Sequence, residues 1–371
     1  MPEQANQTTA VDHLEPIASR AFFDGAATFN TLQTGFTKAA AQNPGEIRES
    51  FYTFAGQRVR FRIVGHALAQ HLTAPFSHLR MTSSVPPDWQ LTIDLWDEKT
   101  TGIRCQPPRA APDSQWTELT VISPDHRFVG QRQPRTLTCF DRATDHLIGS
   151  LVWQEPIFIY EQARPLARPL LQWYNDHDVQ VIHSGLVAWN NQGLLFVGKG
   201  GSGKSTSVLA CVCRGRFAYL SDDHVGLLRL PDGSFLGHSL YNSTALDTNH
   251  LARVPLLAPY ALKGSLPKQR SALLLADMFP ERLVRVVPIR VLFIPRITNA
   301  RESKISPASK GQALLALSPS SLLLFPSRSV RGFVKVTQLV EQVPCYWLES
   351  GYDLASIPRC IEEFLATAIL S

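Results

Sequence analysis

Residues 198–206 have the residue types and the spacing of a phosphate-binding loop. Gly198 is followed, after four residues, by Gly203, Lys204 and Ser205. An apolar stretch precedes the loop and a predicted helix begins at Lys204, and this strand–loop–helix setting makes the pattern specific. Glycines let successive backbone N–H groups turn inward around a polyphosphate, and the start of the helix adds a partial positive charge. The predicted nucleotide-binding residues are Gly198, Lys199, Gly200, Gly201, Ser202, Gly203, Lys204, Ser205 and Thr206.

Two adjacent carboxylates follow the next apolar stretch of the chain. Asp222 and Asp223 come just after residues 217–220. In open α/β sheets, ligands bind at the carboxyl ends of strands, so we expect this pair to face the same crevice as the loop. One carboxylate can hold Mg²⁺ while the other accepts the proton of an attacking hydroxyl. Crowding two carboxylates raises the proton affinity of one of them, which suits a base.

A histidine precedes the loop by one predicted strand. His183 lies in the strand-like segment 181–188. A single histidine is often a core residue, but a strand beside the loop strand would bring this one to the same crevice. An imidazole also accepts a softer ion such as Mn²⁺, which stays open as an alternative to Mg²⁺.

In this order, His183, the loop and the sequence Asp222-Asp223-His224 resemble the HPr serine kinase/phosphorylase family. They are also similar to the nucleotide-binding core of ATP-dependent phosphoenolpyruvate carboxykinase. The resemblance covers residues 180–230 tightly and the rest of the C-terminal half loosely. It implies an α/β fold with a phosphoenolpyruvate carboxykinase-like P-loop core, to which a β-rich (α+β) N-terminal domain is joined.

The resemblance also implies a role for each residue. Lys204 and the loop backbone would hold the β- and γ-phosphates of ATP, and Ser205 and Asp223 would hold the metal. Asp222 or Asp223 would act as the base, and His183 would lie at the metal or at the γ-phosphate. The glycine-rich signature that marks true HPr kinases downstream of these motifs is not found, so the resemblance leaves the acceptor open.

The pattern along the chain predicts three parts. Residues 1–45 are polar and are expected to form a frayed or loosely docked arm. Residues 46–165 contain short alternating stretches, which indicate half-buried strands and a β-rich domain. Residues 166–371 alternate predicted helices and strands, which favours an α/β sheet with helices on its faces. The resemblance implies that this part is an HPr-kinase-like P-loop kinase domain. Within this last part we expect helices over 166–175, 204–213, 269–279, 309–317 and 354–370, and a strand over 284–294.

Composition narrows the partners and the compartment. The net charge is +5, from 36 basic and 31 acidic residues, with no dense basic block, so nucleic acid is not an expected partner. No apolar run approaches the roughly 18 residues of a membrane span, and residues 1–30 lack the apolar region of a secretory signal. The six cysteines form no CxxC pair and are expected to be reduced, mostly buried thiols. We therefore expect a cytoplasmic protein without a membrane partner.

Together these features predict an ATP-dependent, HPr-kinase-like phosphotransferase. Its acceptor would be a hydroxyl, either a Ser or Thr of a peptide or protein, or that of a small molecule. Tyr241 and Asn242 would either line the acceptor pocket or pack in the core. Two alternatives stay open: a nucleotide-binding regulatory or scaffold protein, and a phosphorylase that uses the same site. The sequence also leaves a homo-oligomer open.

Overall fold

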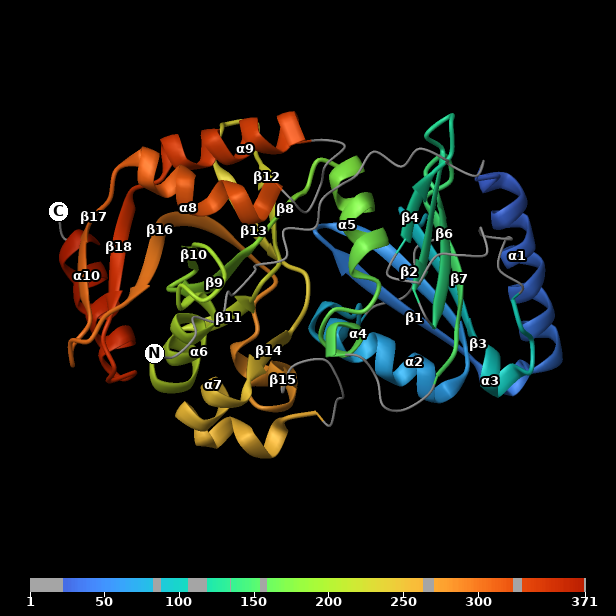
Figure 1. Ribbon diagram of the computed structural model, residues 1–371, viewed down its shortest axis with the longest axis horizontal. Helices are drawn as coiled ribbons and strands as arrows, with labels where there is room; N and C mark the ends of the chain where they lie inside the picture. Colours follow the sequence, from blue (N-terminus) through green and yellow to red (C-terminus); the bar gives the residue numbers. More distant parts are fainter. Residues whose placement is uncertain are drawn as a thin grey trace, which may run out of the picture.

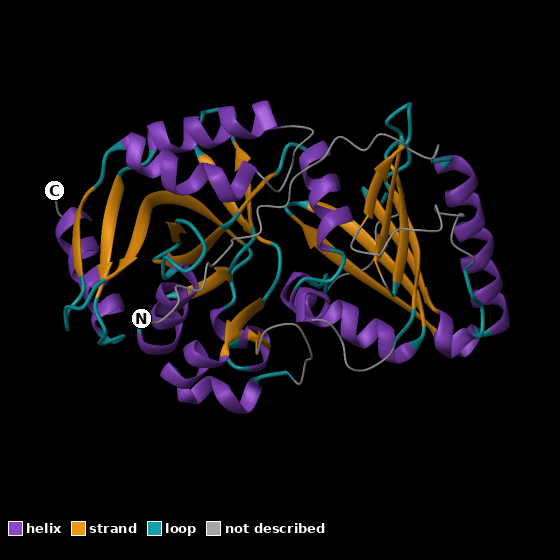
Figure 2. Cartoon of the chain, viewed as in Figure 1, coloured by secondary structure: helices purple, strands orange, loops and turns teal. Residues whose placement is uncertain are grey.

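The computed structural model describes residues 23–82, 88–105, 119–133, 135–153, 159–262, 270–322 and 329–369. These residues have a mixed α/β fold, in which helices cover two large mixed sheets (Figures 1 and 2). One sheet belongs to the N-terminal half of the chain and the other to the C-terminal half. None of the helices in these ranges is long and apolar enough to cross a membrane.

The N-terminal sheet has seven strands in the order β1-β2-β3-β7-β6-β5-β4. Every second residue of its strands faces the core. On β2, for example, Val59, Phe61 and Ile63 are buried against helix α2 (His66–Thr73) and the 3-10 helix η2 (Ala74–Leu79). The strands are β1 (Ile47–Phe54), β2 (Gln57–Val64), β3 (Leu91–Asp97), β4 (Leu119–Ile122), β5 (Phe128–Gln133), β6 (Thr136–Asp141) and β7 (His146–Leu151).

The prediction of a loose N-terminal arm over residues 1–45 is wrong for residues 25–42, which form a helix. Helix α1 (Gly25–Gln42) packs on the face of the N-terminal sheet opposite α2, with Phe29, Leu32 and Phe36 buried. Its apolar residues recur at helical spacing, and a polar composition concealed this pattern. Contact is close, since a Cβ at Gly35 would lie 2.8 Å from the Trp96 ring. Residues 1–22 of the predicted arm lie outside the described residues.

The C-terminal sheet has nine strands, seven of them in the order β11-β9-β10-β16-β13-β12-β8, with β18 beside β16 and β17 beside β18. Helices α6 and α10 cover one face, and α8 and α9 cover the other (Figure 1). The strands are β8 (Gln180–Ile182), β9 (Ser184–Trp189), β10 (Gln192–Val197), β11 (Ala218–Ser221), β12 (Val225–Arg229), β13 (Phe235–Ser239), β16 (Val286–Ile297), β17 (Lys304–Pro307) and β18 (Cys345–Ser350). The covering helices are α6 (Lys204–Arg214), α8 (Lys310–Leu322), α9 (Ser329–Gln342) and α10 (Ser356–Ile369).

One predicted helix in this half is wrong. Residues 269–279 were expected to be helical, but Arg270–Leu274 form strand β15, followed by a single 3-10 turn. Strand β15 pairs with β14 (Ser243–Asp247) in a two-stranded sheet, next to the short helix α7 (Thr248–Arg253). A short apolar run does not distinguish a buried strand from a helix, and here the pairing with β14 decides. The other predicted helices and the strand at 284–294 are present within a few residues of their expected ends.

The two halves share one hydrophobic core. Helix α5 (Ala167–Asp176) buries Trp173 and Tyr174 in the same cluster as the N-terminal sheet. This cluster crosses the predicted boundary between residues 165 and 166, and the domain limits stay a prediction. Tyr241 also joins it, with its ring centroid 5.1 Å from that of Phe76.

Asn242 connects the C-terminal half to η2 of the N-terminal half by three hydrogen bonds. Its backbone N–H donates to Pro75 O at 2.8 Å, and its side-chain amide donates to Ala74 O at 3.0 Å and to Ser77 Oγ at 2.9 Å. Asn242 is fully buried. Tyr241 and Asn242 thus take the packing role, rather than the acceptor-pocket role, of the two that the sequence left open.

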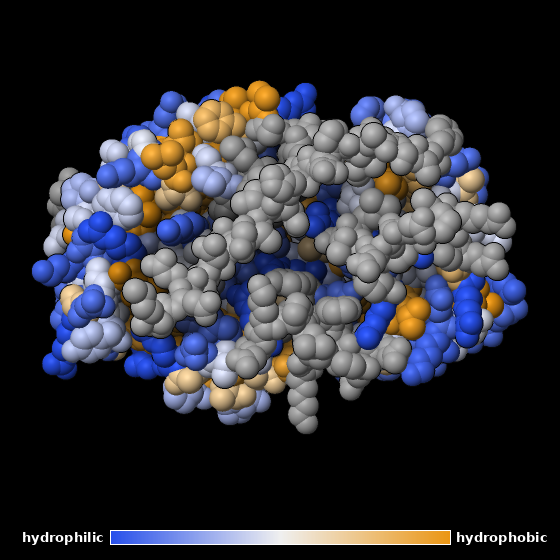
Figure 3. All heavy atoms as spheres, viewed as in Figure 1, coloured by the Kyte–Doolittle hydropathy of each residue, from blue (hydrophilic) through white to orange (hydrophobic). Residues whose placement is uncertain are grey.

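An apolar surface lies on α8 and α9. Leu315 is 76% exposed and Val330 is 75% exposed, and Phe333 and Val334 lie near them on α9. Figure 3 shows apolar residues along its upper left edge, where Figure 1 places these two helices. Exposed apolar surface of this kind is typical of contact sites. Whether another copy of the chain covers it stays a prediction.

Replacing Asn242 should weaken the contact between the two halves and lower the stability of the protein. The change Asn242→Ala removes the side-chain donor to Ala74 O and Ser77 Oγ but keeps the backbone bond to Pro75 O, so we expect the free energy of unfolding to fall by about 1–3 kcal/mol. Urea unfolding followed by circular dichroism measures it. Asn299→Ala, at an exposed position, is the matched control. Equal stability of both variants would contradict the role given to Asn242.

Candidate functional site

Strand order brings the predicted site residues to one edge of the C-terminal sheet. Strand β9 lies between β10 and β11 and is antiparallel to both. The carboxyl ends of β10 and β11 therefore point the same way, toward the start of β9. Val197 pairs with Ser184, so the loop after β10 begins beside His183, which precedes β9. Asp222 follows the end of β11 at the same edge.

The loop has the backbone that its glycines predict. It joins β10 to α6, and Gly198, Gly201 and Gly203 have positive φ values of 152°, 78° and 105°. At Gly198 a Cβ would lie 2.6 Å from Ser202 Oγ, so only glycine fits there. That hydroxyl oxygen is buried and, among the described residues, has no hydrogen-bond partner. Thr206 lies in the first turn of α6.

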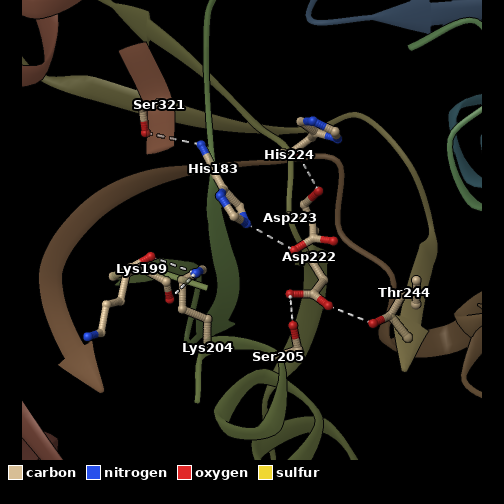
Figure 4. Close-up of polar contacts among 12 residues, drawn as sticks. His183, Lys199, Lys204, Ser205, Asp222, Asp223, His224, Thr244 and Ser321 are labelled. Carbon is tan, nitrogen blue, oxygen red and sulfur yellow. Dashed lines mark hydrogen bonds and ion pairs between the residues drawn. The ribbon is translucent and has the colours of Figure 1, made fainter. Parts of the chain in front are cut away.

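Lys204 folds back onto the loop. Its Nζ donates to the carbonyl oxygens of Gly198 at 2.6 Å and Lys199 at 3.1 Å (Figure 4). Only 5% of Lys204 is exposed. Burial lowers the pKa of this lysine, while the charges of Asp223 and Asp222 work in the opposite direction. The ammonium group thus lies inside the loop, where it can exchange these carbonyls for phosphate oxygens.

Asp222 is held by two hydroxyl groups. Ser205 Oγ donates to Asp222 Oδ1 at 3.0 Å, and Thr244 Oγ1 donates to Asp222 Oδ2 at 2.6 Å. Burial, and then the charge of Asp223, raise the pKa of Asp222 to about 6 against these hydrogen bonds. Ser205 was expected to share a metal with Asp223, but its hydroxyl bonds to Asp222.

Asp223 points toward a different set of groups. Its φ of 68° is left-handed, a conformation that aspartate tolerates better than most residues and that turns its side chain away from that of Asp222 (Figure 4). Its Oδ1 lies 3.3 Å from His183 Nε2, and its Oδ2 lies 2.9 Å from an Arg164 guanidinium nitrogen. Burial alone would raise the pKa of Asp223, but the His183 hydrogen bond and the Arg164 charge outweigh it and hold that pKa well below its usual range.

Sequence reasoning missed three residues of this site. Arg164 contacts Asp223, Thr244 contacts Asp222, and Ser321 of α8 accepts the backbone N–H of His183 at 3.2 Å. Thr244 carried a weak signal, since its segment is part of the looser resemblance. Arg164 and Ser321 follow no recognisable motif, because each reaches the site from a distant element.

The site offers oxygen ligands to a divalent cation. The hydroxyl of Ser205 and the carboxylates of Asp222 and Asp223 are hard donors of the kind that Mg²⁺ prefers. No group of three or more His, Cys, Asp or Glu side chains in the described ranges is arranged to enclose a metal. Mg²⁺ in nucleotide sites commonly has only one or two protein ligands, with phosphate and water completing its shell, so the residues present fit such an ion.

Comparisons with known proteins find matches among solved structures. No protein-family model and no curated protein matches the chain. Among solved structures, the HPr(Ser) kinase/phosphatase from Coxiella burnetii aligns with 51% of this chain and 92% of its own, at 14% identity and a TM-score of 0.30. A TM-score this low supports no conclusion about this chain.

If the loop binds phosphate, inorganic tripolyphosphate should stabilise the protein without any nucleoside. At about 100 times its dissociation constant, a ligand adds about 2.7 kcal/mol to the free energy of unfolding. Thermal unfolding with and without tripolyphosphate measures this. Lys204→Met should weaken the effect strongly, and Lys304→Met, on an exposed strand, should not. Equal stabilisation of both variants would exclude Lys204 from the phosphate site.

Proposed function

We propose that this protein is an ATP-dependent phosphotransferase that moves the γ-phosphoryl group to a hydroxyl. The observation that carries the proposal is the hydrogen bond between Ser205, at the end of the loop, and Asp222. This bond joins the loop that would hold the phosphates to the buried carboxylate of Asp222. The carboxylate of Asp223 lies next to it in a different environment. Phosphoryl transfer needs positioning, a cation and a proton acceptor, and these groups can supply all three.

We assign the cation to Ser205 and Asp222. Asp222 is only 2% exposed, and burial and the charge of Asp223 raise its pKa, which a bound cation would counteract. A bound Mg²⁺, or Mn²⁺ in its place, would neutralise charge on the phosphates. The resemblance implied that Asp223 holds the metal together with Ser205, and this proposal gives that role to Asp222 instead.

We assign the proton acceptor to Asp223. Its side chain is 19% exposed, which gives an acceptor hydroxyl a path to it, and His183 and Arg164 keep it ionised. This departs from the expectation that the carboxylate of higher proton affinity is the base, because that carboxylate, Asp222, is only 2% exposed and is held by Ser205 and Thr244. The hydroxyl oxygen would bond to the γ-phosphorus as the bond from that phosphorus to its bridging oxygen breaks. ADP would leave, and the hydroxyl proton would pass to Asp223. His183 would orient the carboxylate from its other oxygen.

The acceptor is identified by following the phosphoryl group. The protein is incubated with γ-labelled ATP, Mg²⁺ and a lysate of its own organism, with Lys204→Ala as control. Label in a discrete peptide, protein or metabolite only with the unchanged protein would support the transfer. ATP binding without any transfer would favour a regulatory nucleotide-binding protein, and formation of pyrophosphate from a phosphorylated substrate and inorganic phosphate would favour a phosphorylase.

Removing either carboxylate should abolish the reaction but not binding. We expect Asp223→Asn to lower the transfer rate by about 10²–10⁴-fold, the usual contribution of a general base. Asp222→Asn should lower the transfer rate by weakening the binding of the cation. Rates come from the label assay, and nucleotide affinity from calorimetry. Asp232→Asn, on an exposed turn, is the control. Near-normal rates in both site variants would show that the assignment is wrong.

A further inference from the structure

The proposed function gives Arg164 a role toward Asp223 but none toward the nucleotide. Its guanidinium lies 2.9 Å from Asp223 Oδ2, and its side chain is only 13% exposed. Its positive charge also lowers the pKa of Asp222 and of His224. Because His183 takes the other oxygen of Asp223, both oxygens of the proposed proton acceptor are engaged when no nucleotide is present.

The main chain around Arg164 is fixed on both sides. The carbonyl of Ala163 accepts from Ser243 Oγ, and the carbonyl of Pro165 accepts from Tyr241 Oη at 3.2 Å. The residue lies between α4 (Ile159–Ala163) and α5, and α5 is buried in the core of the N-terminal sheet. The backbone thus holds Arg164 at the site, while its long side chain can still change partner by rotation.

We propose that Arg164 changes partner when a nucleoside triphosphate binds, leaving Asp223 for the outermost phosphoryl group. This inference rests on the proposed function and gives that site a residue that distinguishes triphosphate from diphosphate. A guanidinium matches phosphate oxygens as well as carboxylate oxygens, and the outer phosphoryl group carries more charge than a carboxylate. The move would also release Asp223 Oδ2 for the acceptor hydroxyl.

The exchange explains two features together. Without nucleotide, Arg164 balances a carboxylate that would otherwise be a largely buried, unpaired charge. With triphosphate bound, the same cation stabilises negative charge on the transferring group, where phosphoryl transfer needs it. After transfer, the diphosphate no longer reaches Arg164, and the pair with Asp223 forms again.

Calorimetry with Mg²⁺ and a non-hydrolysable ATP analogue, compared with ADP, tests the exchange. We expect Arg164→Gln to weaken binding of the analogue by at least about tenfold, the usual effect of losing one charge-assisted hydrogen bond. Binding of ADP should match that of the control Arg168→Gln, an exposed arginine on the same segment. Arg164→Lys, which keeps the charge, should retain part of the preference for the ATP analogue over ADP. Thermal unfolding reports whether each variant is folded.

A double-mutant cycle with Asp223→Asn tests whether Arg164 leaves Asp223. Asp223→Asn should tighten binding of the analogue, because the arginine no longer has to break its ion pair. The gain should be smaller when Arg164 is already Gln, since only repulsion between Asp223 and phosphate then remains. Equal gains in the two backgrounds would show that Arg164 stays on Asp223 and would overturn the proposal.

Three further outcomes also decide. Equal weakening of analogue and ADP by Arg164→Gln would make Arg164 a general attractor of phosphate and overturn the exchange. A protein that binds neither nucleotide would overturn both this inference and the proposed function. Binding that follows the expected cycle, without transfer of label to any acceptor, would sustain the exchange while the proposed transfer fails.

Discussion

The position of β9 between two strands antiparallel to it is the constraint on which the site depends. Because β10 and β11 both run against β9, their carboxyl ends and the start of β9 share one edge. The loop, Asp222 and His183 follow from these three strands directly. The glycines of the loop and the left-handed φ of Asp223 are then local adjustments that aim groups already brought together. A different order of these strands would separate the same motifs.

Charge balance shapes the rest of the site. Of the two adjacent carboxylates, Asp222 is buried and Asp223 is partly buried, and different neighbours stabilise each one. Asp222 bonds to the neutral hydroxyls of Ser205 and Thr244, which do not offset burial and the charge of Asp223, so its pKa rises to about 6. Asp223 is satisfied by His183 and the charged Arg164, so its pKa falls. Environments that push two neighbouring pKa values apart allow the two groups to take different chemical roles.

Much of this could be predicted from sequence where the signal is local. The loop, the carboxylate pair and the segment containing His183 are short patterns, and the strands that carry them alternate or are uniformly apolar. Helix α1 was missed because polar residues outnumber the few apolar ones that it buries. Strand β15 was mistaken for a helix because its partner, β14, decides its form. Arg164 and Ser321 could not be found, because their place at the site depends on packing between distant elements.

The contacts of Arg164 and Asn242 bear on what the N-terminal half contributes. Residues 163–165 and 241–244 are bonded to each other, and Asn242 is bonded to η2 of the N-terminal half. Thr244, two residues beyond Asn242, holds Asp222, while Arg164 holds Asp223. Both carboxylates are therefore connected to the N-terminal half through short chains of bonded residues. A chain that began at residue 166 would keep the loop and both aspartates, yet it would lose the arginine and expose the shared core. The N-terminal half thus forms part of the site's support, and a ligand that shifted it would act on both carboxylates at once.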